Sequence, residues 1–508
     1  MKKILFFLIL IITFFLIYFF ISSNIGTQKN KYINIIDDLL SQKTKNFLKE
    51  TIFVFKYQKV LKKEISDRDK IIAHKAEIII NNEKKIKDLE NNIIEDKNLQ
   101  IVKKKNVTVE TDLKELKIQI IDLVNDDSLV FELTDESLIE DSNFKIKKYT
   151  NPNLRLTGPR AYFASFKDNL LLMTGSGTIM YASFDELEFD NFILKRIPSN
   201  FRDFVDREYI YEKQSIVVSI FSNKNKIYVS YIKKLNDECY MNSVLVSEFN
   251  FNKLNFEEFF ATNECTPSYE NTVGGNIVNY KNNKILIVIG DWHSYEKYKI
   301  KKPQNLDSLI GKIISVDKNT KDFEILSMGH RNPQGLFYDV INDVIFISEH
   351  GPQGGDEINI NINPNSNNIK NYGWAISSYG EHYGFPDKKK EDLYELAPLN
   401  KSHKNFGFIE PTKYFTPSIA PSQIIKTEEF SNKKEKHVLY LGAMGNDILE
   451  GDLSLHQIIL DANYLFNKHY VIPIGDRVRD IKYIRDMNKI FLYLETSGSI
   501  GILESISN

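Results

Sequence analysis

Short apolar runs bounded by polar turn residues recur along most of this sequence, and they constrain its fold more than any other feature. Many read as a polar turn, four to six apolar residues, and then Gly or Ser. Repeated short strands without helical patterns between them predict an all-β fold built from repeats. Spread over about 350–400 residues, they are too many for one sandwich and predict a β-propeller. The clearest runs are 169–184, 214–232, 283–291, 343–351, 437–445 and 488–503.

The composition agrees with this reading and narrows the function. The chain has 508 residues, which is more than a single hydrophobic core usually serves. Its 34 Phe and 26 Tyr residues favour β-sheets with wide apolar faces. The net charge of −2 gives no electrostatic case for nucleic acid as a partner.

The N-terminus carries the signature of a membrane segment. Lys2 and Lys3 precede the uncharged stretch Ile4–Ile21, which is long enough to span a bilayer. The lysines predict a cytoplasmic N-terminus with the rest of the chain exported. We therefore expect residues 1–25 to form a single-pass anchor in the inner (cytoplasmic) membrane, with a cleaved signal peptide as the alternative.

A charged segment at 28–105 follows the membrane segment and has a helical pattern. It contains no Pro or Gly between Lys29 and Lys105, and an isoleucine recurs every seven residues from Ile65 to Ile93. The second core position of each heptad is polar, so a solvated helical spacer is favoured over an oligomerising coiled coil. The propeller is expected over 107–508, starting somewhere in 107–160.

The two cysteines, Cys239 and Cys265, flank two strand-like runs at 243–249 and 256–262. If these runs form a hairpin, its outer ends meet, and an oxidising compartment would allow a disulfide. Two unpaired thiols are the equally open alternative.

Two glycine-rich motifs, GHRNPQG (329–335) and EHGPQGGDEINI (349–360), are the most unusual local features. Glycines permit positive φ, and such a loop can direct several carbonyl oxygens at one point, as a hard cation requires. Arg331 offers a rigid fork suited to a carboxylate or a quinone oxygen. The alternative is a tight loop whose polar groups satisfy one another.

Together with NYGW (371–374), these motifs resemble the soluble glucose/sorbosone dehydrogenase family, especially its aldose sugar dehydrogenase branch. Members of that family are six-bladed β-propellers that carry pyrroloquinoline quinone (PQQ) and calcium. The resemblance covers roughly residues 270–500, because further segments match in order: IGD at 289–291, LIGKIISVD at 309–317, TPSIAPS at 416–422 and DRVRDI at 476–481.

The resemblance implies two calcium sites. The carbonyl groups of Gly351 and Pro352 would hold the calcium ion that polarises PQQ. Glu357 and Tyr372 would lie at a second, structural calcium site.

The resemblance also implies the PQQ-binding residues. Arg331 would stabilise negative charge on the quinone as hydride arrives, and Asp291 would orient the catalytic histidine. Asn332 and Gln334 would line the cofactor pocket, and Arg477 and Arg479 would pair with the carboxylates of PQQ.

Two positions depart from the family pattern. The family's general base is the His of H-x-G-G-R, but the sequence here reads TVGGN, with Thr272 in place of the His. A threonine does not titrate near neutral pH, so it cannot serve as general base. Met444 occupies the place of a cofactor-binding Lys. His293 and His382 are the nearest histidines that could replace the base, although each reads otherwise as a polar loop residue.

Two functions follow from these observations. The first is a membrane-anchored, exported PQQ-dependent dehydrogenase that oxidises a small sugar or related alcohol and passes electrons to a respiratory acceptor. The alternative is a catalytically inactive, calcium-stabilised propeller that binds a glycan or a protein. Self-association through 28–105 is compatible with either function.

Overall fold

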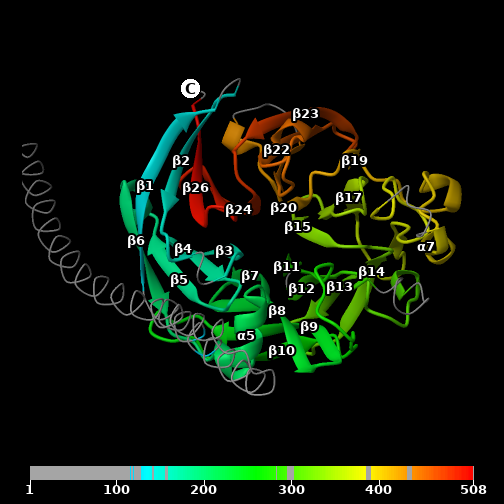
Figure 1. Ribbon diagram of the computed structural model, residues 1–508, viewed down its shortest axis with the longest axis horizontal. Coiled ribbons are helices and arrows are strands. Elements are labelled where there is room, and N and C mark those ends of the chain that lie inside the picture. Colours follow the sequence, from blue (N-terminus) through cyan, green and yellow to red (C-terminus); the bar gives the residue numbers. More distant parts are fainter. Residues whose placement is uncertain are drawn as a thin grey trace, which may run out of the picture. The chain divides into compact units, whose positions relative to one another are not determined.

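The computed structural model describes residues 128–139, 142–154, 158–281, 283–293, 302–384, 391–431 and 437–506, together with positions 115 and 118 (Figure 1). The predicted anchor at 1–25 and the predicted spacer at 28–105 lie outside these residues. Within the described ranges, no helix is both long and apolar enough to cross a bilayer.

The described chain is almost entirely β, and it forms six four-stranded antiparallel blades. The innermost strands of the blades contact one another in a closed cycle, in the order β3, β7, β11, β15, β20, β24 and back to β3. Figure 1 shows the strands arranged around a common centre. The prediction of an all-β propeller is confirmed, and the structure provides the count of blades that the weak repeat did not.

The first three blades follow one another along the chain. Blade 1 contains β3 (Ala161–Phe166), β4 (Asn169–Thr174), β5 (Ile179–Ser183) and β6 (Asn191–Ile197). Blade 2 contains β7 (Val217–Asn223), β8 (Lys226–Asn236), β9 (Cys239–Glu248) and β10 (Glu257–Ala261). Blade 3 contains β11 (Gly274–Tyr280), β12 (Lys284–Ile289), β13 (Lys312–Asp317) and β14 (Phe323–Met328), with the short β18 (Lys370–Asn371) parallel to β14.

The last three blades carry the glycine-rich motifs and the C-terminus. Blade 4 contains β15 (Pro333–Asp339), β16 (Val344–Glu349), β17 (Asp356–Ile362) and β19 (Lys413–Phe415). Blade 5 contains β20 (Pro421–Lys426), β21 (His437–Ala443), β22 (Ser454–Leu460) and β23 (Phe466–Pro473). Blade 6 contains β24 (Val478–Ile484), β25 (Lys489–Leu494), β26 (Ser499–Ser505) and β2 (Phe144–Thr150).

An early strand closes the ring. β2 pairs with β26 along its whole length, from Phe144 opposite Ser505 to Thr150 opposite Ser499. β1 (Leu129–Leu138) forms a hairpin with β2 and also pairs with β6, so that blades 6 and 1 share a nine-stranded sheet. This pairing leaves neither β26 nor β6 as an open sheet edge.

The core consists of apolar layers between neighbouring blades. Leu171 of β4 packs in one cluster with Val229 of β8, and Val246 of β9 packs with Ile287 of β12. The second strand of each blade is apolar on both sides because it is covered by a blade on either face. The helices α5 (Arg207–Lys213) and α7 (Glu391–Leu396) lie in connections between strands.

Cys239 and Cys265 form a disulfide that closes one end of the β9–β10 hairpin. The backbones of Tyr240 and Thr266 exchange two hydrogen bonds of 2.9 Å beside it. The hairpin arrangement expected from the sequence is confirmed, and the open question about the cysteines is answered in favour of the disulfide.

Removing this cross-link is expected to destabilise the propeller. The bridged residues are 26 positions apart, and closing a loop of that size restricts the unfolded chain. The double variant Cys239→Ser, Cys265→Ser should lose about 2–4 kcal/mol of unfolding free energy in denaturant titrations. A reductant should destabilise the wild-type protein similarly and leave the double variant unchanged; equal stability of both proteins would contradict the expectation.

Candidate functional site

The residues implicated by the sequence lie where the innermost strands begin. Thr272 comes just before β11, Arg331 before β15 and Arg477 before β24. The second strand of each blade runs antiparallel to the first, so residues that follow β12 and β16 reach the same end, among them Asp291 and Gly351. Residues that are far apart in the sequence therefore lie together at one end of the inner strands.

Hydrogen bonds between blades hold this end together. The backbone N–H of Gly274 in blade 3 donates to Oδ1 of Asn332 at 3.3 Å, and Nε2 of Gln334 donates to the same oxygen at 2.9 Å. Nη1 of Arg479 in blade 6 lies 3.5 Å from Oε1 of Gln334. The predicted pocket residues of blades 4 and 6 are thus neighbours.

Arg331 is buried and is held from several sides. Its Nη1 donates to the carbonyl oxygens of His350 at 3.1 Å and Gly351 at 2.7 Å. Its Cζ lies 5.4 Å from the ring centre of Trp374 and 5.8 Å from that of Tyr383, within range of cation–π attraction. The guanidinium therefore has a defined place before any ligand binds.

A buried network supports the backbone of Arg331. Oε1 of Glu349 accepts the N–H of Arg331, and Oε2 of Glu349 lies 2.9 Å from Nδ1 of His330. Nε2 of the same histidine lies 2.8 Å from the hydroxyl of Ser327. With Nδ1 donating and Nε2 accepting, a neutral histidine satisfies both contacts. Glu349 and His330 were not identified from the sequence, although both belong to its glycine-rich motifs.

Asp291 is fully buried beneath Trp374. Its Oδ2 accepts from Nε1 of Trp374 at 2.7 Å, and its Oδ1 accepts from the backbone N–H of His293 at 3.0 Å. Burial raises the pKa of this carboxyl group, against the opposing charge of Arg331. The resemblance implies that Asp291 orients a catalytic histidine. In this structure, Asp291 instead accepts hydrogen bonds from the indole of Trp374 and from the turn that follows Asp291 in the chain.

Thr272, which the resemblance places at the position of the family histidine, faces that same turn. Its Oγ1 accepts the N–H of His293 at 3.1 Å, and its carbonyl oxygen accepts the N–H of Trp292 at 3.1 Å. Trp292 and His293 both have positive φ, at 54° and 50°. A positive φ at two consecutive non-glycine residues is energetically costly. The hydrogen bonds to Thr272 and Asp291 maintain this backbone conformation.

The two arginines expected to pair with cofactor carboxylates share a carboxylate of the protein itself. Nε of Arg477 lies 3.3 Å from Oε1 of Glu495, and Nε of Arg479 donates to Oε2. Burial would raise the pKa of Glu495, but the charge of Arg479, followed by those of Arg160 and Arg477, holds it below its usual value. One carboxylate facing three arginines leaves positive charge at this position. Glu495, directly after the apolar run of β25, was not identified from the sequence.

The oxygen atoms proposed to bind the cofactor-associated calcium already have donors within the protein. The carbonyl of Gly351 accepts from Arg331, and the carbonyl of Pro352 lies 3.4 Å from the hydroxyl of Ser418. No cluster of three or more His, Cys, Asp or Glu side chains that could hold a metal ion occurs in the described part of the chain. Each carbonyl oxygen has a second lone pair, so the calcium site expected at Gly351 and Pro352 stays a prediction.

The second expected calcium position contains a histidine. Nδ1 of His403 lies 2.9 Å from the carbonyl oxygen of Tyr372, and its Nε2 lies 3.2 Å from Oε1 of Glu357, within ion-pair range although not well aligned for a hydrogen bond. The hydroxyl of Tyr372 donates to the carbonyl of Ile360 at 3.0 Å. Burial lowers the pKa of His403, but Glu357, the charge of Glu410 and the Tyr372 carbonyl together outweigh it, and the net shift is upward. A histidine nitrogen is a poor substitute for the oxygen ligands that calcium prefers, so this position, with His403 in it, does not fit calcium.

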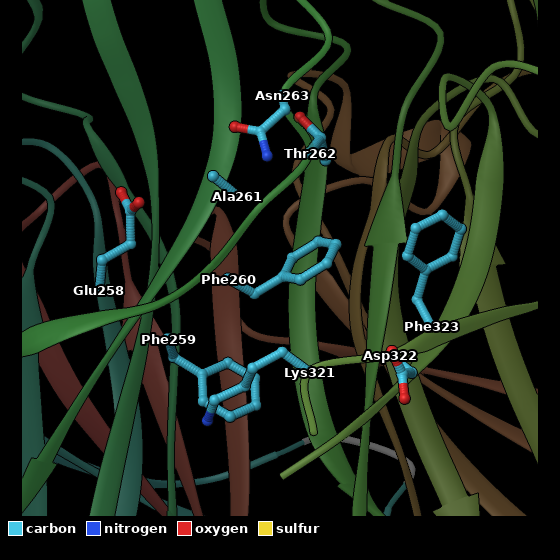
Figure 2. Close-up of a pocket in the computed structure, with 9 residues that line it drawn as sticks. All are labelled: Glu258, Phe259, Phe260, Ala261, Thr262, Asn263, Lys321, Asp322 and Phe323. Atoms are coloured by element: carbon cyan, nitrogen blue, oxygen red, sulfur yellow. The ribbon is translucent and has the colours of Figure 1, made fainter. Parts of the chain in front are cut away.

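A cavity of about 670 Å³ lies elsewhere, at the outer strand β10 and the β13–β14 turn (Figure 2). Its lining includes Phe260 and Phe323, whose ring centres are 6.2 Å apart, and Lys321. None of the residues implicated by the sequence lines it, so we place the functional site at the starts of the inner strands instead.

The pair of His403 and Glu357 predicts a pH dependence of stability. Folding raises the pKa of His403, so its pairing with Glu357 stabilises the protein fully at pH values below the unfolded-state pKa of about 6.5. This contribution to stability is lost as the pH rises through the folded-state pKa of His403. His403→Gln should remove part of the stability at about pH 6 and little at about pH 9, as measured by denaturant unfolding. Glu357→Gln should have the same signature; equal losses at both pH values would show that the histidine is not charged.

The sequence and fold of this chain resemble those of sugar dehydrogenases. Aldose sugar dehydrogenase YliI of Escherichia coli is 28% identical over 221 residues, which cover 40% of this chain and 53% of that enzyme. The curated relatives that match are each aligned over only 34% to 53% of their length.

Solved structures of sugar dehydrogenases share the fold. The apo-form of soluble aldose sugar dehydrogenase from Escherichia coli has a TM-score of 0.52 at 20% identity, covering 68% of this chain and 95% of that one. The holo form of the pyranose dehydrogenase PQQ domain from Coprinopsis cinerea has a TM-score of 0.51 at 10% identity, covering 73% and 97%. The family model described as Glucose / Sorbosone dehydrogenase matches residues 214–503, more than half of the chain. This chain therefore belongs to the glucose/sorbosone dehydrogenase family.

Proposed function

We propose that this protein is a PQQ-dependent sugar dehydrogenase with an altered proton-accepting position. The observation that carries the proposal is the gathering of Arg331, Arg477 and Arg479 with the amides of Asn332 and Gln334 at one end of the inner strands. Such a set suits a planar group that bears carboxylates and quinone oxygens. The fold shared with a PQQ domain supports the same cofactor.

When bound, PQQ supplies the quinone that accepts a hydride from the sugar. The contribution of Arg331 is a fixed cation whose Nη1 rests on the carbonyls of His350 and Gly351. A donor oriented in advance stabilises developing negative charge without reorganisation during the reaction. Arg477 and Arg479 supply positive charge that Glu495 only partly offsets, which favours an anionic ligand beside them.

The same site has lost two groups that family members use. Thr272 cannot take the proton of a sugar hydroxyl, and the buried Met444 provides no charge where a Lys is expected. We therefore propose slow turnover or an altered substrate. A calcium requirement is not part of the proposal.

We also propose that the propeller acts outside the cytoplasm, on the periplasmic or extracellular side of the membrane. The disulfide between Cys239 and Cys265 supports this, since such bonds persist in oxidising compartments. The apolar segment at 1–25 would anchor the protein, and a respiratory component of the membrane would take the electrons.

The proposal is tested by titrating the full-length protein in detergent with PQQ, following the absorbance of the cofactor and the melting temperature. We expect saturable binding with a clear rise in melting temperature, because a ligand that binds only the folded state stabilises it. Arg479→Met should weaken PQQ binding by at least about tenfold, since it removes a charge-assisted contact. Arg485→Met removes an exposed arginine of the same blade and should have no effect. Absence of PQQ binding at high excess would instead favour a non-catalytic binding propeller.

Restoring the base should raise turnover. Thr272→His places an imidazole beside Asp291, and general-base catalysis contributes about 10²–10⁴-fold. With PQQ bound and a dye as electron acceptor, we expect aldose oxidation to increase by at least about tenfold and to gain a pH dependence near the pKa of a histidine, about 6.5. Thr272→Gln, of similar polarity but without a titrating group, is the matched control. An equal rate in both variants would argue against this position being the missing element.

A further inference from the structure

The cavity at the outer strands of blades 2 and 3 lies apart from the candidate functional site and has an aromatic lining (Figure 2). Phe260 of β10 is half-buried, Phe323 at the start of β14 is 47% exposed, and their ring centres lie 6.2 Å apart. Figure 2 shows both rings beside the open space, with Lys321 at one end of it. Ligand-binding cavities typically measure about 300–1,000 Å³, and this one, at about 670 Å³, falls in that range.

The outer edge of blade 2 is uncovered beside this cavity. β10 is the last strand of its sheet, and in the described part of the chain it pairs only with β9. The outer strands of three other blades have an added neighbour: β18 pairs with the end of β14, and β1 lies between β2 of blade 6 and β6 of blade 1. A free strand edge presents backbone N–H and carbonyl groups that can pair with one more strand. Strand addition at the rim is thus a feature of this fold, and β10 has the free edge that it requires.

β10 is held in position before any ligand binds. Directly after it, the N–H of Thr262 donates to the carbonyl oxygen of Asn242 at 3.0 Å, and the disulfide at Cys265 follows. The ring of Phe259 is buried in the apolar core between blades 2 and 3, with Nζ of Lys321 3.8 Å from its centre. A strand that is already ordered loses little conformational entropy when another segment pairs with it.

The charge at the cavity depends mainly on Lys321. Its Nζ donates to the carbonyl oxygen of Lys318 at 2.7 Å, which is a neutral acceptor. Partial burial and the charge of Lys226 lower the pKa of Lys321, and the acidic groups around it only partly compensate. The lining carboxylate of Glu258 is paired with Lys233. The ammonium group of Lys321 therefore favours a carboxylate on the ligand.

We propose that the cavity between blades 2 and 3 binds an extended peptide segment of a partner protein, which adds as a strand to the free edge of β10. Alternate side chains of an extended segment point to the same side. An apolar side chain of the segment packs against Phe260 and Phe323, and an acidic side chain two residues along pairs with Lys321. In this mode of recognition, backbone hydrogen bonds supply affinity and side-chain pockets supply specificity. The inference is independent of the proposed dehydrogenase function, because the cavity shares no residue with the candidate functional site.

The test measures binding of the peptide acetyl-Thr-Phe-Thr-Asp-Thr-Thr-amide to the full-length protein in detergent by titration calorimetry. We expect saturable binding with a Kd below about 1 mM. Phe323→Ala should weaken binding about five- to tenfold, because it removes apolar surface from the cavity. Lys321→Met should weaken it about three- to fivefold and leave unchanged the binding of a peptide with Asn in place of Asp. Phe466→Ala, at a 42% exposed phenylalanine on the outer strand β23, is the matched control and should have no effect.

Two N-methylated peptides test the strand addition itself. One carries N-methyl groups at Phe and Asp, and the other at the Thr residues on either side of Phe. Only every second N–H of an added strand faces its neighbour, so one peptide should lose binding and the other should keep it. Equal binding of both would show that the side chains bind without strand addition, which would overturn the proposal. It would also be overturned by unchanged binding in Phe323→Ala, by no binding to the wild-type protein at about 1 mM peptide, or by a dimer in sedimentation that Phe323→Ala abolishes, since a second copy of this chain would then occupy the cavity.

Discussion

The pairing of β2 with β26 is the interaction on which the rest of the structure depends. A strand from the beginning of the described chain completes the last blade, so the six inner strands form a ring rather than an open array. The candidate functional site lies at one end of these inner strands and takes residues from blades 3, 4 and 6. An open array would leave two free edges and would not hold Arg479 of blade 6 near Gln334 of blade 4.

Within this ring, carboxylates of the protein itself pair with part of the positive charge of the site. Glu349 holds the backbone of Arg331 and the ring of His330, and Glu495 joins Arg477 and Arg479. Because an unpaired buried charge is costly, these internal partners stabilise the site whether or not a ligand is present. The arrangement of arginines and amides can therefore coexist with Thr272 at the position that the resemblance assigns to the family base. In the proposed function, cofactor binding depends on the arginines and catalysis depends on a proton acceptor.

Much of the fold follows from local patterns. The apolar runs at 283–291 and 343–351 correspond to β12 and β16, because a strand covered on both faces needs consecutive apolar residues. The hairpin of β9 and β10 was predictable from two runs flanked by cysteines, and its ends do meet. The number of blades was not predictable from repeats, because each blade keeps the pattern of its strands while its loops differ in length and composition. The glycine-rich motifs indicated the region of the candidate site from the sequence alone, because their backbone conformations require particular residue types.

The sequence by itself determined the strands, the family and the identity of Arg331, Asn332, Gln334, Arg477 and Arg479 as candidates, because each is carried by residue type and spacing along the chain. Only the tertiary structure decided what those residues touch. Glu495 lies between two arginines, His403 lies between Glu357 and Tyr372 where a cation was expected, and Tyr383 lies beside Arg331. These contacts join residues that are distant in the sequence or lie on separate loops. Their formation depends on how the blades and loops pack, and no local pattern encodes it.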